Sequence, residues 1–477
     1  MSSGENFTLR MGMHLHLIGI GGAGISAIAR VLLGRGFVVS GSDRDENDQT
    51  VSLRQEGAVV FVGHDADHID GADAVIISSA ISDSNPEVIA ARAAGIPLFK
   101  RADFLGYLMN GSVGIAIAGS HGKTTTTGMI AHILLETGND PTVILGGVVS
   151  DWKVNGRAGQ GNYFVIEADE YDYMFLGLKP QLAIITNIEH DHPDIFPTSR
   201  EYEDAFRRFA QLLPEDGHLI VCGDDEGVSN LLNKLDLTGV KITSYGIPQG
   251  SNSGSFDLQA LDSRPNQLGG TDFLVQKGAQ IMGLARLRIP GLHNVKNALA
   301  VIAIALELGL EFAQICRALA GFGGVGRRFQ ITGEIGGVTI IDDYAHHPTE
   351  IRATLAAARQ RYPERRLWAV WQPHTYSRTK LMLTQFADSF SEADKVVALD
   401  IYRSRETDSL GLNSAAVVEA MNHPSAIYIA QKNDAINFLL DRIHPDDVVL
   451  TLGAGDGNLV GEGLLKALQK RVHSFHP

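Results

Sequence analysis

Residues 113–125 read VGIAIAGSHGKTT, and this stretch decides the fold. Its first six residues are apolar enough for a buried strand, and residues 129–136 beyond it predict a helix that Gly138 ends. A glycine-rich loop between a strand and a helix offers backbone N–H groups and the positive end of the helix to a phosphate. The stretch therefore predicts an α/β domain with a phosphate-binding loop.

The loop also has the side chains that nucleotide chemistry needs. Lys123 can neutralise the charge of a transferring phosphoryl group, and the Thr124 hydroxyl can ligate magnesium. Two residues separate Gly119 from Gly122, whereas the common P-loop has four there. We interpret the loop as an ATP-binding site made of Gly119, Ser120, His121, Gly122, Lys123, Thr124 and Thr125.

Strand-like and helix-like segments alternate on both sides of this loop. Apolar runs at 14–18, 37–42 and 74–78 alternate with helical stretches at 23–33 and 85–94. Strand-like runs return at 338–341, 367–371, 395–399 and 448–452, beyond a glycine-rich junction at 321–326. Such alternation is typical of parallel sheets covered by helices. We predict three α/β domains in series, at 1–110, 111–325 and 326–477, with a surface excursion at 250–270.

Composition narrows the class of protein. The 477 residues are 44% apolar and 20% charged, as in globular proteins, and the net charge of -15 argues against nucleic acid as a partner. The two cysteines, Cys222 and Cys316, cannot build a disulfide framework or a thiolate metal cluster. No signal-peptide pattern begins the sequence, and the apolar run at 298–306 is too short for a bilayer. We therefore expect a cytoplasmic protein that does not span a membrane.

A second glycine-rich loop, GIGGAG at 19–24, follows the first strand-like run and opens a helix. Asp43 lies roughly 20 residues beyond it, where a dinucleotide-binding fold places the acid that binds the ribose. Taken alone, this pattern favours NAD. The alternative is a tight strand-to-helix turn that binds nothing.

Acidic residues follow two further strand-like runs, at 163–166 and 182–186. Because the carboxyl ends of parallel strands meet at one edge of a sheet, we expect Glu167 and His192 beside the ATP loop. Magnesium prefers oxygen ligands, which a carboxylate there supplies. We expect several of four nearby acids to be solvated loop residues: Asp169, Glu170, Glu189 and Asp191.

These motifs, together with later ones, resemble the Mur ligases over essentially the whole length. The later motifs are GLHNVKN at 291–297, RRF at 327–329, DDYAHHPTE at 342–350, QPHTYSR at 372–378 and GAGD at 453–456. The resemblance implies a Rossmann-like N-terminal domain for a UDP-sugar, a central P-loop ATPase-type domain and a C-terminal Rossmann-like domain for an amino acid. It also replaces NAD by the UDP pyrophosphate as the expected ligand of the first glycine-rich loop.

The activity implied by the resemblance is an ADP-forming ligation of L-alanine to the lactyl carboxylate of UDP-N-acetylmuramate, through an acyl phosphate, in peptidoglycan precursor synthesis. ATP is then the co-substrate. Two Mg²⁺ ions are expected, with Mn²⁺ as an alternative metal. The sequence leaves a monomer and a homodimer open.

The resemblance further assigns roles to individual residues. The expected UDP-sugar contacts are Gly19, Gly21, Gly22, Ala23, Gly24, Ser42 and Asp43. The expected ATP contacts beyond the loop are His293, Asn294, Asn297, Arg328 and Asp343. Thr124 and Glu167 are expected to bind one metal ion and His192 a second. The amino-acid side is assigned to Tyr344, His346, His374 and Arg378, and the catalytic residues to Lys123, Glu167, His192 and the candidate base His346.

Two segments depart from the family pattern. Thr375 stands where relatives usually carry an arginine, and residues 400–406 lack the small-residue turn expected before Glu406. Arg403 or Arg405 is a candidate to supply the missing charge. The departures concern amino-acid selectivity and leave the reaction type unchanged.

Three other functions compete with this one. A related ligase attaches a recycled tripeptide to the same nucleotide sugar. An NAD(P)-dependent oxidoreductase with an added nucleotide module would explain the loop at 19–24 but leaves Lys123 and Glu167 without a role. A non-catalytic, ATP-regulated binding protein would not need Lys123, Glu167 and His192 together.

Overall fold

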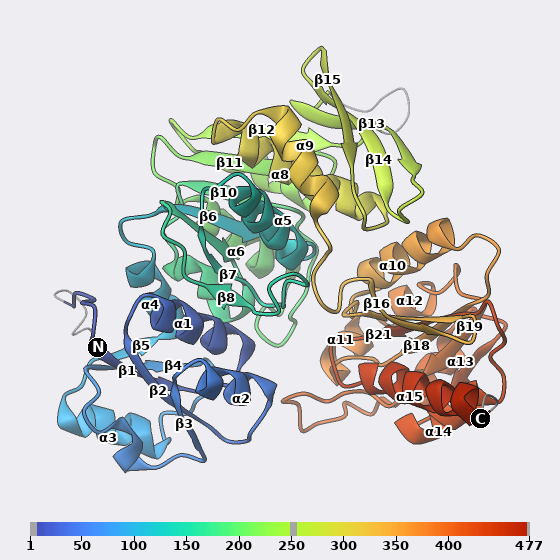
Figure 1. Cartoon of the computed structure of the whole chain (residues 1–477), viewed down its shortest axis with the longest axis horizontal. Coiled ribbons are helices and arrows are strands. Elements are labelled where there is room, and N and C mark those ends of the chain that lie inside the picture. Colours follow the sequence, from blue (N-terminus) through green and yellow to red (C-terminus); the bar gives the residue numbers. More distant parts are fainter. Residues whose placement is uncertain (1–6, 249–254, 475–477) are drawn as a thin grey trace.

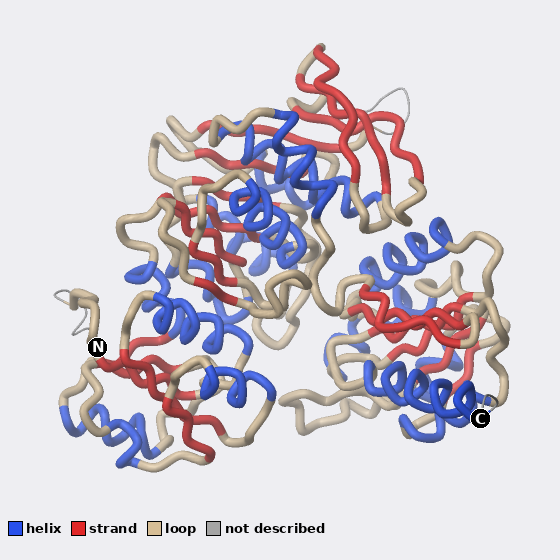
Figure 2. Tube along the Cα trace, in the orientation of Figure 1, coloured by secondary structure: helices blue, strands red, loops and turns tan. Residues whose placement is uncertain are grey.

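The computed structural model describes residues 7–248 and 255–474, which form three α/β units in series along the chain (Figure 1). Each unit is built on its own sheet, with helices packed on the sheet faces (Figure 2). The predicted fold class, three α/β domains in series, is therefore confirmed.

The N-terminal unit has a five-stranded, fully parallel sheet in the order β3-β2-β1-β4-β5. β1 is the central strand, and its last four residues are buried because the sheet is covered on both faces. The first glycine-rich loop joins β1 to α1 at the carboxyl end of the sheet. The elements are β1 (His14–Ile18), α1 (Ala23–Gly34), β2 (Val38–Asp43), α2 (Asp48–Gln55), β3 (Val59–Val62), η1 (Ala66–Ile69), β4 (Ala74–Ile77), α3 (Pro86–Ala94), β5 (Leu98–Lys100) and α4 (Arg101–Leu108).

The central unit has a ten-stranded sheet in the order β15-β14-β13-β12-β11-β10-β6-β9-β7-β8. β6 pairs with β9 and β10 in parallel, so the ends of these three strands meet beside the glycine-rich loop at 119–125, as predicted. The elements are β6 (Val113–Ala118), α5 (Lys123–Glu136), β7 (Thr142–Ile144), β8 (Gly156–Arg157), β9 (Tyr163–Glu167), η2 (Tyr171–Gly177), β10 (Leu182–Ile185), α6 (Ser199–Ala210), β11 (His218–Cys222), α7 (Glu226–Leu232), β12 (Lys241–Gly246), β13 (Leu258–Pro265), β14 (Thr271–Lys277), β15 (Gln280–Arg286), α8 (Leu292–Glu307) and α9 (Phe312–Gly321).

The C-terminal unit has a six-stranded sheet in the order β16-β17-β21-β18-β19-β20, parallel except for β16. The elements are β16 (Gln330–Ile335), β17 (Val338–Asp343), α10 (Pro348–Arg361), β18 (Leu367–Trp371), α11 (Tyr376–Leu381), α12 (Leu383–Ala387), β19 (Lys395–Ala398), α13 (Ser414–Ala420), β20 (Ala426–Tyr428), α14 (Lys432–Leu440), β21 (Val448–Leu452) and α15 (Asn458–Ser474).

The prediction of a surface excursion at 250–270 was partly wrong. Residues 249–254 lie outside the described residues, but the rest contains β13, which pairs with β12 and β14 and extends the central sheet. Its outer half is largely exposed, so it carries polar residues that read as a loop. Among the described residues, no helix has the length and apolar composition that crossing a bilayer requires.

The N-terminal and central units share one hydrophobic core. Buried residues of α1, such as Ile28, belong to the same cluster as Phe164 of β9 and Phe206 of α6. The buried clusters of the C-terminal unit contain residues of that unit alone. The first two units are therefore fixed to each other by apolar burial, and the third is not.

A buried polar contact reinforces the first junction. Asn155, before β8, is 2% exposed and donates to the Ala23 carbonyl at 2.7 Å. Its amide oxygen accepts from Arg30 Nη1 at 2.5 Å. Arg30 is itself buried in α1, so Asn155 satisfies charged and neutral groups that have no access to water.

We expect Asn155→Ala to lower the free energy of unfolding by about 2 kcal/mol, because it leaves an N–H of the buried Arg30 guanidinium without its acceptor. Urea unfolding followed by circular dichroism measures this change. Asn233→Ala, at the exposed end of α7, is the matched control and should change stability by less than about 0.5 kcal/mol. Equal effects of the two substitutions would contradict the assigned role of Asn155.

Candidate active site

The loop between β6 and α5 requires glycine at both ends. Gly119 has φ +138°, and a Cβ there would lie 1.9 Å from Thr186 Oγ1. Gly122 has φ +82°, and its Cβ would lie 2.6 Å from Asn297 Oδ1. Both positions combine a backbone region that favours glycine with contacts that exclude a side chain. The loop is thereby held against Thr186, just beyond β10, and against the N-terminal half of α8.

Lys123, the first residue of α5, turns its ammonium group back into the loop. Its Nζ donates to the carbonyl oxygens of Gly119 at 2.5 Å and Ser120 at 3.1 Å, and lies 2.9 Å from Glu170 Oε2. Burial alone would lower the pKa of Lys123, but the charge of Glu170 outweighs it and raises the pKa. The cation is therefore permanent and sits where a phosphate on the loop would meet it.

The predicted metal ligands fall into two groups. Thr124 Oγ1 donates to Glu167 Oε1 at 2.9 Å, and the Gly146 N–H donates to Glu167 Oε2 at 2.6 Å. Burial raises the pKa of Glu167, an effect that a bound cation would reverse. The hydroxyl and the carboxylate thus form the oxygen donor set that magnesium prefers. His192, at φ +54°, instead has its Nε2 3.5 Å from Glu170 Oε1, on the Lys123 side.

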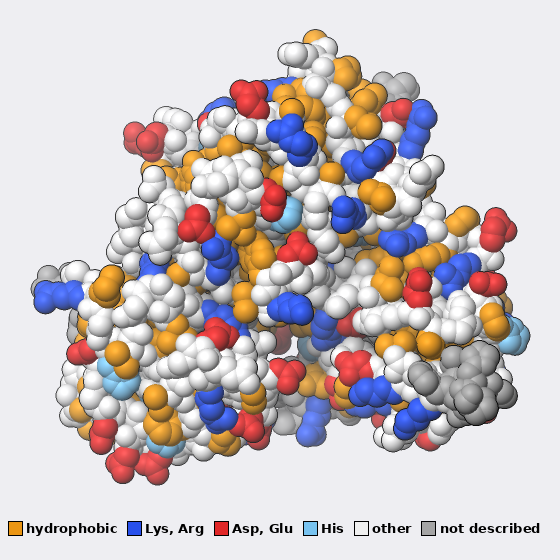
Figure 3. Space-filling model, viewed as in Figure 1, with side chains coloured by type: hydrophobic (Ala, Val, Ile, Leu, Met, Phe, Trp, Pro, Cys, Tyr) orange, Lys and Arg blue, Asp and Glu red, His pale blue; other side chains and the backbone are white. Residues whose placement is uncertain are grey.

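A cavity of about 230 Å³ lies between the loop and the C-terminal unit. The face in Figure 3 is hollowed where the units meet, and charged side chains stand at the opening. The predicted ATP residues that line the cavity are His121, Gly122, Thr124, Thr125, His293, Asn294, Asn297, Arg328 and Asp343. Cys222, Tyr245 and Ile289 also line it, so its wall is both apolar and polar, as a nucleotide site requires.

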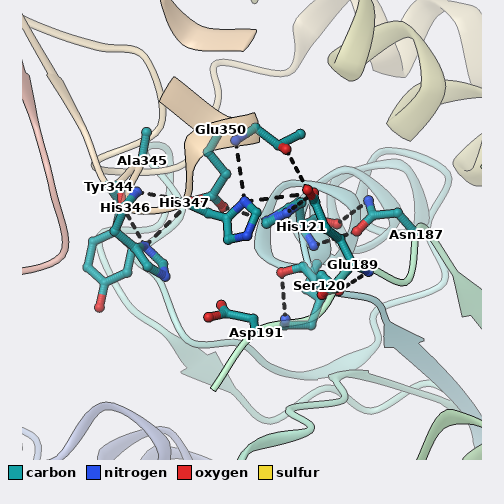
Figure 4. A network of polar contacts seen from close by, with 12 residues as sticks. Ser120, His121, Asn187, Glu189, Asp191, Tyr344, Ala345, His346, His347 and Glu350 are labelled. Atoms are coloured by element: carbon teal, nitrogen blue, oxygen red, sulfur yellow. Dashed lines mark hydrogen bonds and ion pairs between the residues drawn. The ribbon is translucent and has the colours of Figure 1, made fainter. Parts of the chain in front are cut away.

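His121 connects the loop to the C-terminal unit (Figure 4). Its Nε2 lies 3.0 Å from Glu189 Oε2 and its Nδ1 lies 3.2 Å from Glu350 Oε1, on α10. Burial alone would lower the pKa of His121, but the two carboxylates outweigh it and raise the pKa to about 9. Thr349 Oγ1 also donates to Glu189 Oε1 at 2.8 Å. The phosphate loop and α10 are thus joined through one charged imidazole.

The four residues predicted on the amino-acid side gather near this junction. The rings of Tyr344 and His346 are 5.3 Å apart, those of His346 and His374 are 5.9 Å apart, and Arg378 Nη1 donates to His374 Nδ1 at 3.0 Å. Burial lowers the pKa of His346 to about 3 and that of His374 to about 4, so both imidazoles are neutral. Arg378 Nε donates to Asp191 Oδ1 at 2.8 Å.

The two departures from the family pattern lie close to these residues. Thr375 has φ +67°, a region that β-branched residues rarely adopt, directly after His374. Glu406 accepts hydrogen bonds from the backbone N–H groups of Tyr376 and Ser377 and so caps α11. The Arg405 guanidinium lies 5.9 Å from the centre of the Tyr171 ring in the central unit.

The first glycine-rich loop contacts the acid predicted beside it. The Gly21 N–H donates to Asp43 Oδ2 at 2.8 Å, and a Cβ at Gly21 would lie 2.9 Å from that oxygen. Ser42 Oγ donates to the buried Glu87 Oε2 at 2.6 Å. A Cβ at Gly24 would lie 1.5 Å from Arg101 Nη1, so a guanidinium rests directly on the loop.

Of the four acids among which several were expected to be solvated, two are partly exposed and two are buried. The Glu170 side chain is fully buried against Lys123, and that of Asp191 is 3% exposed against Arg378. Asp169 and Glu189 keep 38% and 42% exposure. The sequence also gave no role to Arg101 or Glu350. They belong to the site because of partners that are distant in the chain: Asp169 for Arg101 and His121 for Glu350.

Models of the Mur ligase family match most of the chain. The model for its catalytic domain matches residues 14–112, that for the middle domain 117–305, and that for the glutamate ligase domain 327–455. The UDP-N-acetylmuramate–L-alanine ligase of Roseiflexus sp. (strain RS-1) is 43% identical over 468 residues, covering 96% of this chain and 100% of that protein. The chain belongs to the Mur ligase family. The ligase of the same name from Geotalea uraniireducens is 42% identical, covering 95% of this chain and 98% of that protein.

Solved structures agree with this Mur ligase over its length. The UDP-N-acetylmuramate–alanine ligase MurC of Thermotoga maritima has a TM-score of 0.81 at 29% identity, covering 96% of this chain and 100% of that one. A murein peptide ligase of Psychrobacter arcticus has a TM-score of 0.70 at 27% identity, covering 96% and 99%. Membership of a ligase family removes the oxidoreductase and the non-catalytic binding protein as leading interpretations.

The raised pKa of His121 makes one junction dependent on pH. Because the folded-state pKa of about 9 exceeds the ordinary 6.5, the stabilisation is complete below about pH 6.5 and is lost as pH rises through 9. We expect the thermal unfolding midpoint to fall between pH 7 and pH 9.5 more steeply in the wild type than in His121→Gln. Parallel profiles for the two proteins, measured by differential scanning calorimetry, would rule this coupling out.

Proposed function

We propose that this Mur ligase joins L-alanine to the lactyl carboxylate of UDP-N-acetylmuramate, giving UDP-N-acetylmuramoyl-L-alanine, ADP and phosphate. Relatives named UDP-N-acetylmuramate–L-alanine ligase match the chain over 95% of its length or more. The observation that carries the proposal is the Lys123 ammonium, largely screened from water, in a glycine-rich loop that faces the C-terminal unit across a cavity. That arrangement suits a reaction in which phosphoryl transfer is followed by attack of a second substrate.

The chemistry follows from the poor electrophilicity of a carboxylate. The lactyl carboxylate attacks the γ-phosphorus of ATP and becomes an acyl phosphate with loss of ADP. The amine of L-alanine then attacks the acyl carbon, and phosphate leaves. Lys123 and the loop N–H groups stabilise the charge that develops on the transferring group. Enclosure between the central and C-terminal units keeps the acyl phosphate from water.

ATP is assigned to the cavity, with Gly119 to Thr125 on the phosphates. His293, Asn294 and Asn297 contact the nucleotide from α8, and Arg328 and Asp343 contact it from the C-terminal unit. Their positions in the cavity wall support this assignment. Burial lowers the pKa of His293 to about 4, so it meets the nucleotide as a neutral donor or acceptor.

Magnesium is assigned to Thr124 and Glu167, with a second ion on His192. A divalent cation there would neutralise phosphate charge during transfer. The contact between Thr124 and Glu167, and the burial of that carboxylate, support the first site. Manganese has the same preference for oxygen donors and remains an alternative.

The UDP-sugar is assigned to the N-terminal unit, with its pyrophosphate over Gly19, Gly21, Gly22, Ala23 and Gly24. Ser42 and Asp43 are assigned to the uridine end. The N-terminus of α1 and the Arg101 guanidinium give this loop positive potential, which supports the assignment.

The amino acid is assigned to Tyr344, His346, His374 and Arg378. The guanidinium of Arg378 suits a carboxylate because it offers paired N–H donors. His346 Nδ1 lies 2.9 Å from the Tyr344 carbonyl oxygen, which leaves Nε2 as the acceptor. A pKa of about 3 makes this imidazole a weak base, so the electrostatics of the amino-acid-free protein do not favour His346 as the general base.

The remaining proposals concern the domains, the location and the oligomeric state of the protein. We assign the three substrates to units at 1–110, 111–325 and 326–477 and place the reaction in the cytoplasm, where ATP is available. A monomer and a homodimer are both compatible with a site built from one chain. No nucleic acid or membrane is needed as a partner.

The deciding experiment measures phosphate release from ATP and Mg²⁺ with UDP-N-acetylmuramate, with and without L-alanine. We expect release that needs both substrates and that Lys123→Ala lowers by at least about 100-fold, because a preorganised cation is lost. Lys277→Ala, at the exposed end of β14, is the matched control and should retain full activity.

A parallel reaction with the tripeptide L-alanyl-γ-D-glutamyl-meso-diaminopimelate separates the nearest alternative. Release with the tripeptide but not with L-alanine would assign the protein to the peptide-recycling ligases. Release with neither would overturn the proposed substrate while leaving family membership intact.

A further inference from the structure

One buried ion pair joins the central unit to the C-terminal unit. Asp191 follows β10, and Arg378 belongs to α11. Arg378 Nε donates to Asp191 Oδ1 at 2.8 Å, and the two side chains are 4% and 3% exposed. Two opposite charges, from units with separate hydrophobic cores, therefore meet out of contact with water.

The ion pair lies between the residues assigned to phosphoryl transfer and those assigned to the amino acid. On one side, Asp191 is adjacent to His192, whose Nε2 is 3.5 Å from Glu170, the partner of Lys123. On the other side, Arg378 Nη1 donates to His374, which lies beside His346. Phosphoryl transfer is assigned to the first side and amino-acid binding to the second. The ion pair therefore lies directly between the two groups of residues.

The guanidinium of Arg378 keeps N–H donors that have no acceptor among the described residues. Nε is bonded to Asp191 and Nη1 to His374, while Nη2 forms no hydrogen bond with any residue that the structure describes. A carboxylate that reached Arg378 along its open edge would compete with Asp191 for the same group. The forked geometry of a guanidinium favours a carboxylate that accepts two hydrogen bonds over one that accepts a single bond.

Opening a buried ion pair is costly unless both charges find new partners. A ligand with a carboxylate alone would satisfy Arg378 and leave Asp191 buried with His192 as its remaining partner, through the His192 N–H at 2.7 Å and the imidazole at 3.7 Å. A ligand with an ammonium group alone would do the reverse. An α-amino acid carries both charges, on two groups attached to the same carbon, so its insertion exchanges one ion pair for two.

We propose that Asp191 is a positioning residue for the incoming amino acid. Its carboxylate holds Arg378 in the amino-acid-free protein and takes the ammonium group of the amino acid when the amino acid's carboxylate displaces it. This inference rests on the proposed function, which requires an amino acid to bind at Arg378. It adds that recognition depends on the zwitterion and that the nitrogen is placed on the side of Lys123, where the acyl phosphate forms.

The test compares wild type with Asp191→Asn, which keeps the shape of the side chain and removes its charge. We expect the KM for L-alanine to rise by about 30-fold or more, as for loss of one buried charge contact, with the KM for ATP and for UDP-N-acetylmuramate changed by less than about twofold. Propionate, which has alanine's carboxylate and lacks its ammonium group, serves as a competitive inhibitor. Its Ki should fall in the variant, because Arg378 is no longer occupied.

The opposite shifts for alanine and propionate separate positioning from a merely structural role. If Asp191 only held the two units together, all substrate constants would rise and propionate would bind more weakly as well. That result, or an unchanged KM for L-alanine, overturns the inference. Arg361→Gln is the matched control, because Arg361 Nη1 donates to the Gly269 carbonyl at 2.9 Å across the same two units. Arg361→Gln should leave the KM for L-alanine and the Ki for propionate unchanged.

Asp191→Glu carries the test if Asp191→Asn does not fold. Because a carboxylate still holds Arg378, propionate should inhibit it as weakly as the wild type, and tighter inhibition would overturn the inference. The two proposals fail in different ways. Absence of alanine-dependent phosphate release in the wild type rejects the proposed function before any variant is compared.

Discussion

The ammonium group of Lys123 must keep its charge in a place that excludes most water, and the arrangement of the site depends on this requirement. Glu170 meets it by lying 2.9 Å away, fully buried. Glu170 is held in turn by the Tyr202 hydroxyl at 3.1 Å and has the His192 imidazole nearby. Burial alone would raise the pKa of Glu170, but the charge of Lys123 and the contact with His192 outweigh it and lower the pKa to about 2. The ends of β6 and β9 and the segments after β9 and β10 are thereby fixed around one positive charge.

Protonation divides the histidines of the site into two kinds. His121 lies between Glu189 and Glu350 and has a raised pKa, so it is a cation at neutral pH. Burial lowers the pKa of His346, His347 and His374 to between about 3 and 4, so they are neutral. Positive charge is thus concentrated where phosphate groups are assigned. Neutral imidazoles surround the place of the amino acid, where a further cation would repel an ammonium group.

Much of the fold could be predicted because its signals are local. The apolar run of β6, the glycines that follow it and the helix beyond are adjacent in sequence, and periodicity with turn chemistry identifies them. The same holds for β1 and the loop at 19–24. Strand β13 was missed because half of it is exposed and therefore polar. Its pairing with β12 and β14 comes from tertiary contacts that composition does not record.

The candidate site was predictable in its loop and less so in its acids. Glu167 could be expected beside Thr124 because Glu167 ends β9, the parallel neighbour of β6, and Thr124 lies just beyond the loop that follows β6. Whether Glu170 or Asp191 is solvated depends on Lys123 and Arg378, and the Arg378 contact crosses 187 positions of the chain. Single-sequence reasoning has no access to such pairs, which explains why these two buried acids read as ordinary loop residues.

The three units are joined by two kinds of junction. The first is a continuous apolar core, with Asn155 and Arg30 at its edge, and the second is built largely from charged and polar contacts around His121, Asp191 and Glu350. Salts act on the two junctions to different extents. Ions screen charge contacts, whereas sulfate and phosphate strengthen apolar burial. Concentrated sulfate therefore strengthens the first junction. At the second it weakens only contacts that water reaches, such as that between Thr349 and the half-exposed Glu189, and it leaves the buried Asp191–Arg378 pair nearly unscreened.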